Sequence, residues 1–296
     1  MGPIDASFEG IGMTMMMRRP ESTVRVEVLG AELRRLREAA GLTLLEVSEL
    51  VGISQSHLSK MELGKRTQQL EDVASLCTVY KAFGQDRQDL LELARNSTEL
   101  GYWQTRRQSY GSRVATLRML ESRATALFNF ETVLIPGYLQ TVPYMRAVMR
   151  GVMVGDEEEI DRRVVARLQR QTQVRRTNTE LTAIVCESAL RAQIGGPAVM
   201  RDQLNHVVEA AMRPQVRLRV VPTSAGAHPG LEGAFIRLRF PDRPGVVFVG
   251  CGTSSLFLEE TDDIEHYKIV AAELFKVALS HEESVALAAS IAAVLE

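Results

Sequence analysis

The sequence LTLLEVSELVGISQSHLSKME, residues 42–62, decides the fold at the N-terminal side of this chain. Thr43 and Glu46 have the spacing of a capping box, in which each side chain satisfies a backbone amide at a helix start. Gly52 stands where this helix must end, because glycine best tolerates the positive φ of a helix C-terminus. Ser54 is a good N-cap for the next helix. The stretch therefore predicts two short helices joined by a tight turn, the layout of a helix-turn-helix DNA reader.

The apolar residues of this stretch indicate which sides of the two helices are buried. In the second helix, Leu58 and Met61 have the spacing of an inward pair, and Ile53 is expected to pack between the helices. An ordinary surface hairpin is the alternative, but the agreement of caps, turn and inward residues favours a DNA reader. In the first helix we expect one apolar face made of Leu45, Val47, Leu50 and Val51. The polar groups left facing outward suit base edges and phosphates, and they are Gln55, Ser56, His57, Ser59 and Lys60.

Residues 29–81 resemble the lambda-repressor-like helix-turn-helix domain of the XRE family, an all-α fold of five helices. LGAELRRLREAAG at 29–41 resembles its first helix, MELGKR at 61–66 the end of its recognition helix, and LEDVASLC at 70–77 its fourth helix. The resemblance implies that bases are read at the positions of Gln55, Ser56 and Lys60. It also implies that Lys65 and Arg66, just past the helix, contact phosphate.

One position departs from this family. Leu44 stands where the family usually has a glutamine that holds a phosphate, and an apolar side chain cannot make that contact. Either the phosphate is held by Thr43 and backbone amides, or the domain binds DNA weakly without a partner.

Composition excludes several classes of protein. The 296 residues have room for about two domains, and 45% of them are hydrophobic, which is enough for packed cores. A net charge of −2 is not that of a general nucleic-acid coater. The three cysteines form no CxxC pair and the five histidines have no metal-ligand spacing, so we expect reduced thiols, no metal and a cytoplasmic protein, associated with the nucleoid when bound to DNA. No apolar run is long enough to span a bilayer.

The chain divides into four segments. Residues 1–24, which are rich in methionine, are expected to be a disordered leader. Residues 25–100 form the helix-turn-helix domain, which a fifth helix at about 86–99 closes. GYWQTRRQSYG at 101–111 is interpreted as a linker that Trp103 anchors on a domain surface, although this ring could instead stack on a base. Residues 112–296 form the second domain.

The second domain is predicted to be α+β, with an antiparallel sheet and helices packed on one side. Apolar residues alternate with arginine in 216–221 and 234–240, which indicates strands with one buried and one solvated face. Two further strands are expected at 181–185 and 246–249. Helices are expected at 112–130, 142–151, 156–176, 197–212, 261–279 and 282–295.

Residues 112–295 resemble the uncharacterised DUF5753 domain of actinobacterial XRE regulators. VLIPGYLQT at 133–141, GGPAVMRDQL at 195–204 and AGAHPG at 225–230 carry this resemblance. It implies a transcriptional regulator like the WhiJ-type developmental regulators, which a small DUF397-type protein often accompanies. Gly250 stands where relatives commonly carry an acid, so any role of that acid is in doubt here.

Little in the second domain indicates catalysis. His228 lies in a glycine-rich loop, but no nucleophile, base and acid set can be identified around it. We therefore expect no enzyme activity and no cofactor. The loop at 226–230 is a candidate cover for an effector pocket or a docking face for a partner, and the plain alternative is a tightly packed turn.

Energetics favours a homodimer. One reading helix makes few base contacts, each giving about 1–3 kcal/mol of discrimination, and two half-sites supply the rest. The apolar face of the last helix is a candidate dimer interface or part of the core: Val285, Leu287, Ala288, Ile291, Ala292 and Leu295. Two functions follow. The first is a sequence-specific transcriptional regulator of a double-stranded DNA operator, whose second domain dimerises and senses a ligand or small protein. The alternative is an antitoxin-like protein-interaction module that acts mainly through a DUF397-type partner.

Overall fold

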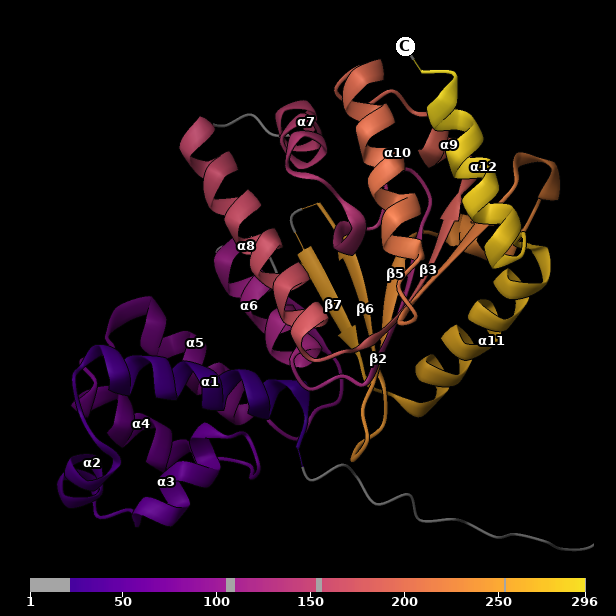
Figure 1. The fold of residues 1–296 in the computed structure, drawn as a ribbon. Coiled ribbons are helices and arrows are strands. Elements are labelled where there is room, and N and C mark those ends of the chain that lie inside the picture. Colours follow the sequence, from indigo (N-terminus) through magenta and orange to yellow (C-terminus); the bar gives the residue numbers. More distant parts are fainter. Residues whose placement is uncertain (1–21, 105–109, 153–155, 253, 296) are drawn as a thin grey trace, which may run out of the picture.

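The computed structural model describes residues 22–104, 110–152, 156–252 and 254–295, which form a helical part and a larger part built on a sheet (Figure 1). Most of the leader expected at residues 1–24 lies outside the described residues. Its last residues belong to the first helix, because Thr23 is the N-cap and its side chain accepts a hydrogen bond from Val26 N. The side chain of Trp103 also lies outside the described part.

The helical part contains the helices that the sequence predicts. Gly30 marks the close crossing of the first and third, since a Cβ there would lie 2.3 Å from the Met61 carbonyl oxygen. Leu58 and Met61 are buried, as expected for an inward pair. The helices are α1 (Val24–Ala39), α2 (Leu44–Val51), α3 (Gln55–Glu62), α4 (Leu70–Val79) and α5 (Gly84–Arg95).

The apolar face of α2 is different from the predicted one. Leu45 is 52% exposed and Leu50 is 63% exposed, so both point away from the core. The buried side is formed by Val47, with Leu44 and Val51 partly buried against the core. These three residues have the i, i+3, i+7 spacing of one helix face, and Leu45 and Leu50 do not fall on it.

The second part contains one sheet with the strand order β1-β7-β6-β5-β2-β3-β4. Its strands are β1 (Tyr102–Gln104), β2 (Ala126–Glu131), β3 (Glu180–Cys186), β4 (Val216–Val221), β5 (Phe235–Arg239), β6 (Val246–Cys251) and β7 (Ser254–Leu258). The prediction of an antiparallel sheet is only partly right, because β2 pairs with β3, and β3 with β4, in parallel. Helices connect these strands, and such crossovers bring strands into parallel pairing, whereas the short turns around β6 give antiparallel pairs.

Two segments were predicted with the wrong secondary structure. The helix expected at 112–130 ends at Glu121, and the strand β2 follows it in the middle of the sheet. The expected linker contributes the strand β1, which pairs with β7. The remaining helices are α6 (Tyr110–Glu121), α7 (Val142–Val152), α8 (Glu157–Arg176), α9 (Glu187–Arg191), α10 (Pro197–Ala211), α11 (Thr261–Val277) and α12 (His281–Ala293), with 3₁₀ turns η1 (Gly137–Leu139), η2 (Thr223–Ala225) and η3 (Pro229–Glu232).

Helices cover both faces of the sheet, contrary to the prediction of helices on one side. Leu127 and Ala183 belong to the core under α10 and α12, whereas Phe130 belongs to a second core under α11. The arginines expected in solvent lie partly under α11. Arg219 donates a hydrogen bond to the Ala278 carbonyl oxygen at 2.9 Å. The sheet therefore forms the middle layer of three.

The last helix is part of the core. Ala288, Ile291 and Ala292 on α12 are buried, and the Ser284 hydroxyl on the same helix accepts a 2.9 Å hydrogen bond from Val220 N in β4. The face expected to form a dimer interface is therefore covered within one chain, and its alternative, core packing, is correct. Among the described helices, none is long and apolar enough to cross a membrane.

Candidate nucleic-acid interface

The turn between α2 and α3 has the predicted geometry. Thr43 N donates to Glu46 Oε2 at 2.7 Å, and Glu46 N donates to Thr43 Oγ1 at 3.3 Å, which completes the capping box. Gly52 adopts φ 71°, the left-handed conformation that ends α2. Ser54 Oγ then accepts a hydrogen bond from His57 N at 3.3 Å and begins α3. These local bonds fix the orientation of α3 relative to α2.

α3 lies at the edge of the helical part, away from the sheet (Figure 1). Gln55 and Ser56 in its first turn and Lys60 in its last turn are exposed, as predicted for groups that reach DNA. Lys65 and Arg66, in the segment that follows, are exposed as well. The five residues thus form an accessible polar surface on one element and its C-terminal extension.

Two other predicted contact residues are less accessible. His57 is half-buried, and its Nε2 lies 3.9 Å from Asp72 Oδ2 on α4. Ser59 is half-buried too. Both side chains are therefore less available for a contact with DNA than the exposed residues of α3.

Thr43 has a different environment from the one that a phosphate contact needs. Its hydroxyl donates to Glu46 Oε2 at 2.8 Å, and the same carboxylate accepts the Thr43 amide. Hydrogen bonds from Thr43 lower the pKa of Glu46, so this carboxylate is charged at neutral pH. An anion of the protein itself occupies the N-terminus of α2, and Leu44 beside it packs toward the core. This geometry argues against a phosphate at Thr43.

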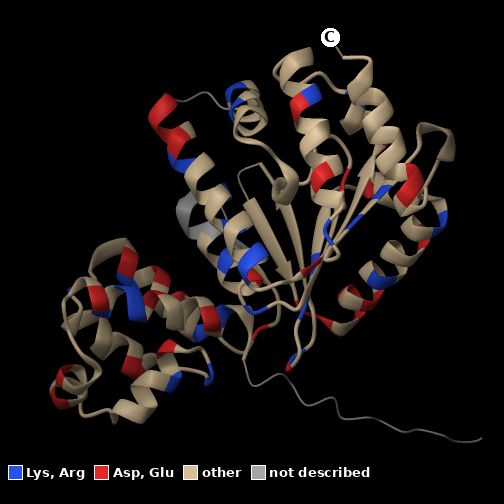
Figure 2. Cartoon of the chain, in the orientation of Figure 1, with Lys and Arg blue, Asp and Glu red and all other residues tan. Residues whose placement is uncertain are grey.

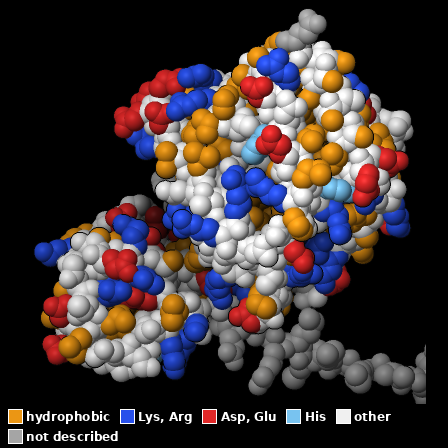
Figure 3. Space-filling view, in the orientation of Figure 1, with side chains coloured by type: hydrophobic (Ala, Val, Ile, Leu, Met, Phe, Trp, Pro, Cys, Tyr) orange, Lys and Arg blue, Asp and Glu red, His pale blue; other side chains and the backbone are white. Residues whose placement is uncertain are grey.

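The positive charges of the helical part fall into two groups. Residues 25–100 contain ten Lys and Arg but twelve Asp and Glu, and Figure 3 shows both signs intermixed on one face. Arg34, Arg35 and Arg37 are neutralised by Glu38, Glu32 and Glu62 respectively, at 2.5–2.7 Å. By contrast, no carboxylate among the described residues lies within ion-pair distance of the three cations at α3: Lys60, Lys65 and Arg66. Lys81, Arg87 and Arg95 elsewhere in the helical part also make no ion pair among the described residues, so unpaired charge lies both at α3 with the segment after it and around α5 (Figure 2).

A charged cluster, buried except for Arg123 at its edge, joins the helical part to the sheet. Glu259, which follows β7, accepts hydrogen bonds from Val24 N at 3.0 and 3.1 Å and so caps α1. Arg243, in the turn between β5 and β6, pairs with Glu259 at 2.7 Å and also with Glu27 on α1. Arg123, after α6, pairs with Glu27 at 3.1 Å. We call these four charged residues the junction cluster.

The junction cluster is close to the end of α3. Gly64, two residues past α3, packs so tightly on α1 that a Cβ there would lie 2.7 Å from the Glu27 Cα. Burial raises the pKa of Glu259, while Arg243 and the Val24 amide act in the opposite direction. Sequence reasoning missed this cluster, because Val24 and Glu259 are 235 residues apart and neither carries a local motif.

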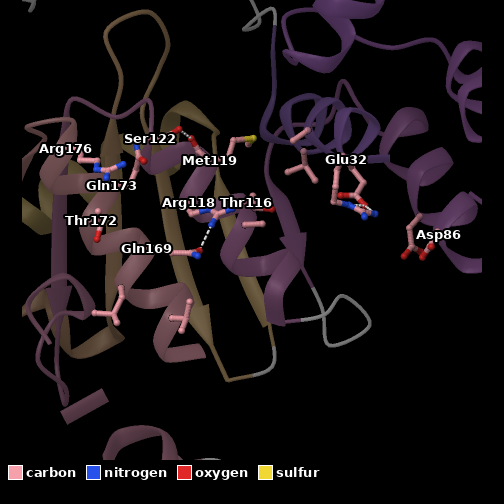
Figure 4. Close-up of a pocket in the computed structure, with 17 residues that line it drawn as sticks. Glu32, Asp86, Thr116, Arg118, Met119, Ser122, Gln169, Thr172, Gln173 and Arg176 are labelled. Atoms are coloured by element: carbon pink, nitrogen blue, oxygen red, sulfur yellow. Dashed lines mark hydrogen bonds and ion pairs between the residues drawn. The ribbon is translucent and has the colours of Figure 1, made fainter. Parts of the chain in front are cut away.

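Away from the junction cluster the two parts diverge and leave a cleft of about 1180 Å³. One wall consists of α1 and α5 and carries Glu32 and Asp86, and the other consists of α6 and α8 (Figure 4). Arg118 donates to Gln169 Oε1 at 2.7 Å within the second wall.

The loop of His228 packs on the sheet. The His228 ring meets the Phe130 ring edge-on at a centroid distance of 6.1 Å. A Cβ on Gly230 would lie 2.4 Å from the Phe130 ring, so this residue packs directly on the ring. His228 Nδ1 is buried and has no hydrogen-bond partner among the described residues, so a role of the 226–230 loop as a pocket cover or a docking face stays a prediction beside the packed-turn alternative. A cavity of about 250 Å³ lies on the opposite face of the sheet, beside η1 and α8.

Comparison with protein families agrees with both parts of the structure. The family model described as a domain of unknown function, DUF5753, matches residues 114–289. A model of a helix-turn-helix domain matches residues 28–91. No curated protein and no solved structure shows a significant match to the chain. The matches therefore support a helix-turn-helix domain followed by a domain whose chemistry the family leaves open.

Proposed function

Since this chain belongs to the DUF5753 family and carries a helix-turn-helix domain, we propose that it is a sequence-specific DNA-binding transcriptional regulator of the XRE type. The observation that carries the proposal is the surface of α3. The outer face of α3 is exposed, and N-caps at Thr43 and Ser54 begin α2 and α3 respectively. Lys65 and Arg66 follow α3, and no carboxylate of the described residues pairs with them.

The proposed roles on α3 follow from side-chain chemistry. Gln55 and Ser56 lie in the first turn, which a helix-turn-helix presents to base edges in the major groove. An amide such as that of Gln55 can bond both to the N6 and N7 of adenine. Lys60 reaches bases or phosphates from the last turn, and Lys65 and Arg66 contact phosphates beside the groove.

A single α3 supplies few base contacts, so the proposal includes a homodimer on an operator with two half-sites. The apolar face of α12 is buried within one chain and does not serve as the interface. The dimer surface must therefore involve other residues.

The second domain is proposed to control the orientation of α3. Glu259 holds the N-terminus of α1, and Glu27 on that helix touches Gly64 at the end of α3. A ligand or a small DUF397-type protein that shifts the end of β7 would thereby shift the reading surface. Coupling of this kind needs two arrangements with different affinities for the effector.

The alternative function, an antitoxin-like protein-interaction module, has one observation in its favour. Leu45, Leu50 and Leu63 are between 48% and 63% exposed around the reading helix. Exposed leucines suit a protein contact better than a phosphate backbone. In that case a DUF397-type partner would be the main ligand, and DNA binding would be secondary.

A gel shift with designed variants tests the proposal. Duplexes that bind the full chain are first selected from a random pool and from the DNA upstream of its own gene. The Gln55→Ala/Lys60→Ala double variant should lose the shifted band. The matched control, Arg87→Ala/Gln88→Ala, removes the same kinds of group from the exposed side of α5 and should keep it. Equal binding by the two variants would mean that α3 is not the reading helix. A band that appears only with a neighbouring small protein would favour the alternative.

A further inference from the structure

The cavity beside η1 and α8 has the composition of a small-molecule site. It encloses about 250 Å³ between α6, α8, the corner at η1 and the strands β2, β5, β6 and β7. This volume is at the small end of ligand sites, which suits a small organic molecule better than a peptide. It also lies on the sheet face opposite the His228 loop.

One side of the cavity is apolar. Leu117 from α6, Leu134 and Ile135 from the corner before η1, and Phe248 from β6 line this side. The backbone amide of Ile135 donates a hydrogen bond to the Tyr144 hydroxyl at 3.1 Å, which fixes the position of this residue. A rigid apolar wall can hold the hydrocarbon part of a ligand without further ordering.

The other side presents a guanidinium that the protein leaves unsatisfied. Arg167 on α8 donates from Nη1 to the side-chain oxygen of Gln140, whose own amide donates to the Ile135 carbonyl at 2.6 Å. Arg167 Nε is buried and has no hydrogen-bond partner among the described residues. No carboxylate among the described residues lies within ion-pair distance of this guanidinium. A buried donor without an acceptor, such as this Nε on the partly exposed Arg167, is costly unless a ligand accepts from it.

Of the two arginines of α8 that line the cavity, only Arg170 has its positive charge neutralised by a carboxylate of the described residues. Arg170, one turn further along α8, is neutralised by the buried Glu121 at 2.5 Å, and Tyr138 donates to the same carboxylate. Glu131 also faces the cavity, and burial raises its pKa to about 7. At neutral pH much of this carboxyl is therefore protonated, and it can donate a hydrogen bond rather than repel an anion.

We propose that this cavity binds a small amphipathic organic acid, whose carboxylate pairs with Arg167 and whose hydrocarbon part lies against Leu134 and Phe248. The fork of a guanidinium matches a carboxylate, and Arg167 is already oriented by Gln140. As a sensing site this inference rests on the proposed regulator function, but the binding event itself does not.

The location of the cavity gives the ligand a route to the DNA-binding part. Ser254 and Ser255, at the start of β7, line the cavity, and the same strand ends directly before Glu259. Glu259 caps α1, and α1 touches the end of α3 at Gly64. Filling the cavity against β7 therefore acts on the strand that holds the junction cluster.

Binding is tested with the full chain and paired probes. Butanoate, hexanoate, benzoate and phenylacetate are compared with their primary amides, which have the same shape without the charge, by thermal shift and calorimetric titration. At least one acid should bind saturably, and its amide should bind at least tenfold more weakly. Failure of every acid to bind, or equal binding of the amides, would overturn the proposal.

Three variants locate the site. Arg167→Gln should weaken acid binding by roughly tenfold or more, which corresponds to about 1.4 kcal/mol. Ser254→Phe, which fills the cavity from β7 without removing Arg167, should abolish binding and guards against a folding defect in the first variant. Arg162→Gln, on the exposed side of α8, is the matched control and should bind normally. Full binding by the Arg167 and Ser254 variants would place the acid elsewhere and refute the assignment.

The outcomes for site and function can be separated. Acid binding with unchanged DNA affinity would keep the site and remove its sensing role. DNA binding without acid binding would refute the site and keep the proposed function.

Discussion

The proposed recognition helix α3 and the junction cluster hold positive charge in opposite ways. At α3, the cations Lys60, Lys65 and Arg66 are exposed and unpaired among the described residues. At the junction, Arg243 is 10% exposed and contacts two carboxylates that are 1–2% exposed. The comparison teaches that charge count alone says little about partners. The paired charges join the two parts of the chain, and the unpaired ones are those that we propose to contact DNA.

The largest effect is expected from breaking the junction cluster. Arg243→Met leaves Glu27 and Glu259 buried with much less compensation, which should lower the free energy of unfolding by about 3–5 kcal/mol. Urea denaturation of the full chain measures this change. Arg239→Met is the control, because its pair with Glu180 is exposed on both sides and should change stability by about 1 kcal/mol or less. Similar effects of the two variants would contradict the contrast between buried and exposed pairs.

A half-buried acid, Glu131, which has no ion pair among the described residues, sharpens the same comparison. The folded-state pKa of Glu131 is raised to about 7 by burial, above the unfolded value, so the folded state binds more protons between these two values. The contribution of Glu131 to stability is therefore fully present below about pH 4.5 and is lost as the pH rises through about 7. Glu131→Gln should flatten this part of the stability profile. An unchanged slope in the variant, measured by urea denaturation from pH 4.5 to 8, would rule this cause out.

A smaller effect is expected where α1 crosses α3. Gly30→Ala places a Cβ against the Met61 carbonyl oxygen and should cost about 1–3 kcal/mol through overpacking. Gly151→Ala is the control, since that helical glycine faces open space and alanine should stabilise it by about 0.5–1 kcal/mol. Thermal unfolding of both variants should show a lower melting temperature for Gly30→Ala and a higher one for Gly151→Ala. A change of the same sign in both would mean that the close crossing of α1 and α3 is not rigid.

The smallest effect on stability is expected at the exposed cations. Arg66→Ala should leave the unfolding free energy within about 0.5 kcal/mol of the parent. It should weaken binding to all duplexes alike and reduce the slope of log affinity against log salt by about one. Fluorescence anisotropy at several salt concentrations measures this slope. A loss confined to one sequence would assign Arg66 to base reading instead.

Local signals explain which parts of the fold could be predicted. Thr43, Gly52 and Ser54 act within three or four residues of their own positions, so the sequence predicted α2, the turn and α3 correctly. The alternation in β5 likewise predicted a strand. The face of α2 was wrong for Leu45 and Leu50, because their side depends on where the other helices pack.

The remaining features depend on distant parts of the chain. β2 was read as the end of a helix, since its buried position between two neighbours gives it apolar residues on both sides. The alternating pattern predicted that Arg219 is solvated, but in the structure its guanidinium bonds to the carbonyl oxygen of Ala278 at the end of α11. The junction cluster and the cavity at Arg167 join residues from many elements, and no local pattern marks them.

Amide chemical-shift mapping of the full chain against a selected duplex tests the central claim most directly. If α3 reads DNA, the largest changes should fall on Gln55, Ser56 and Lys60 and on Lys65 and Arg66, with little change on the exposed side of α5. Changes that avoid α3, or saturable DNA binding without any change between residues 54 and 66, would contradict the account.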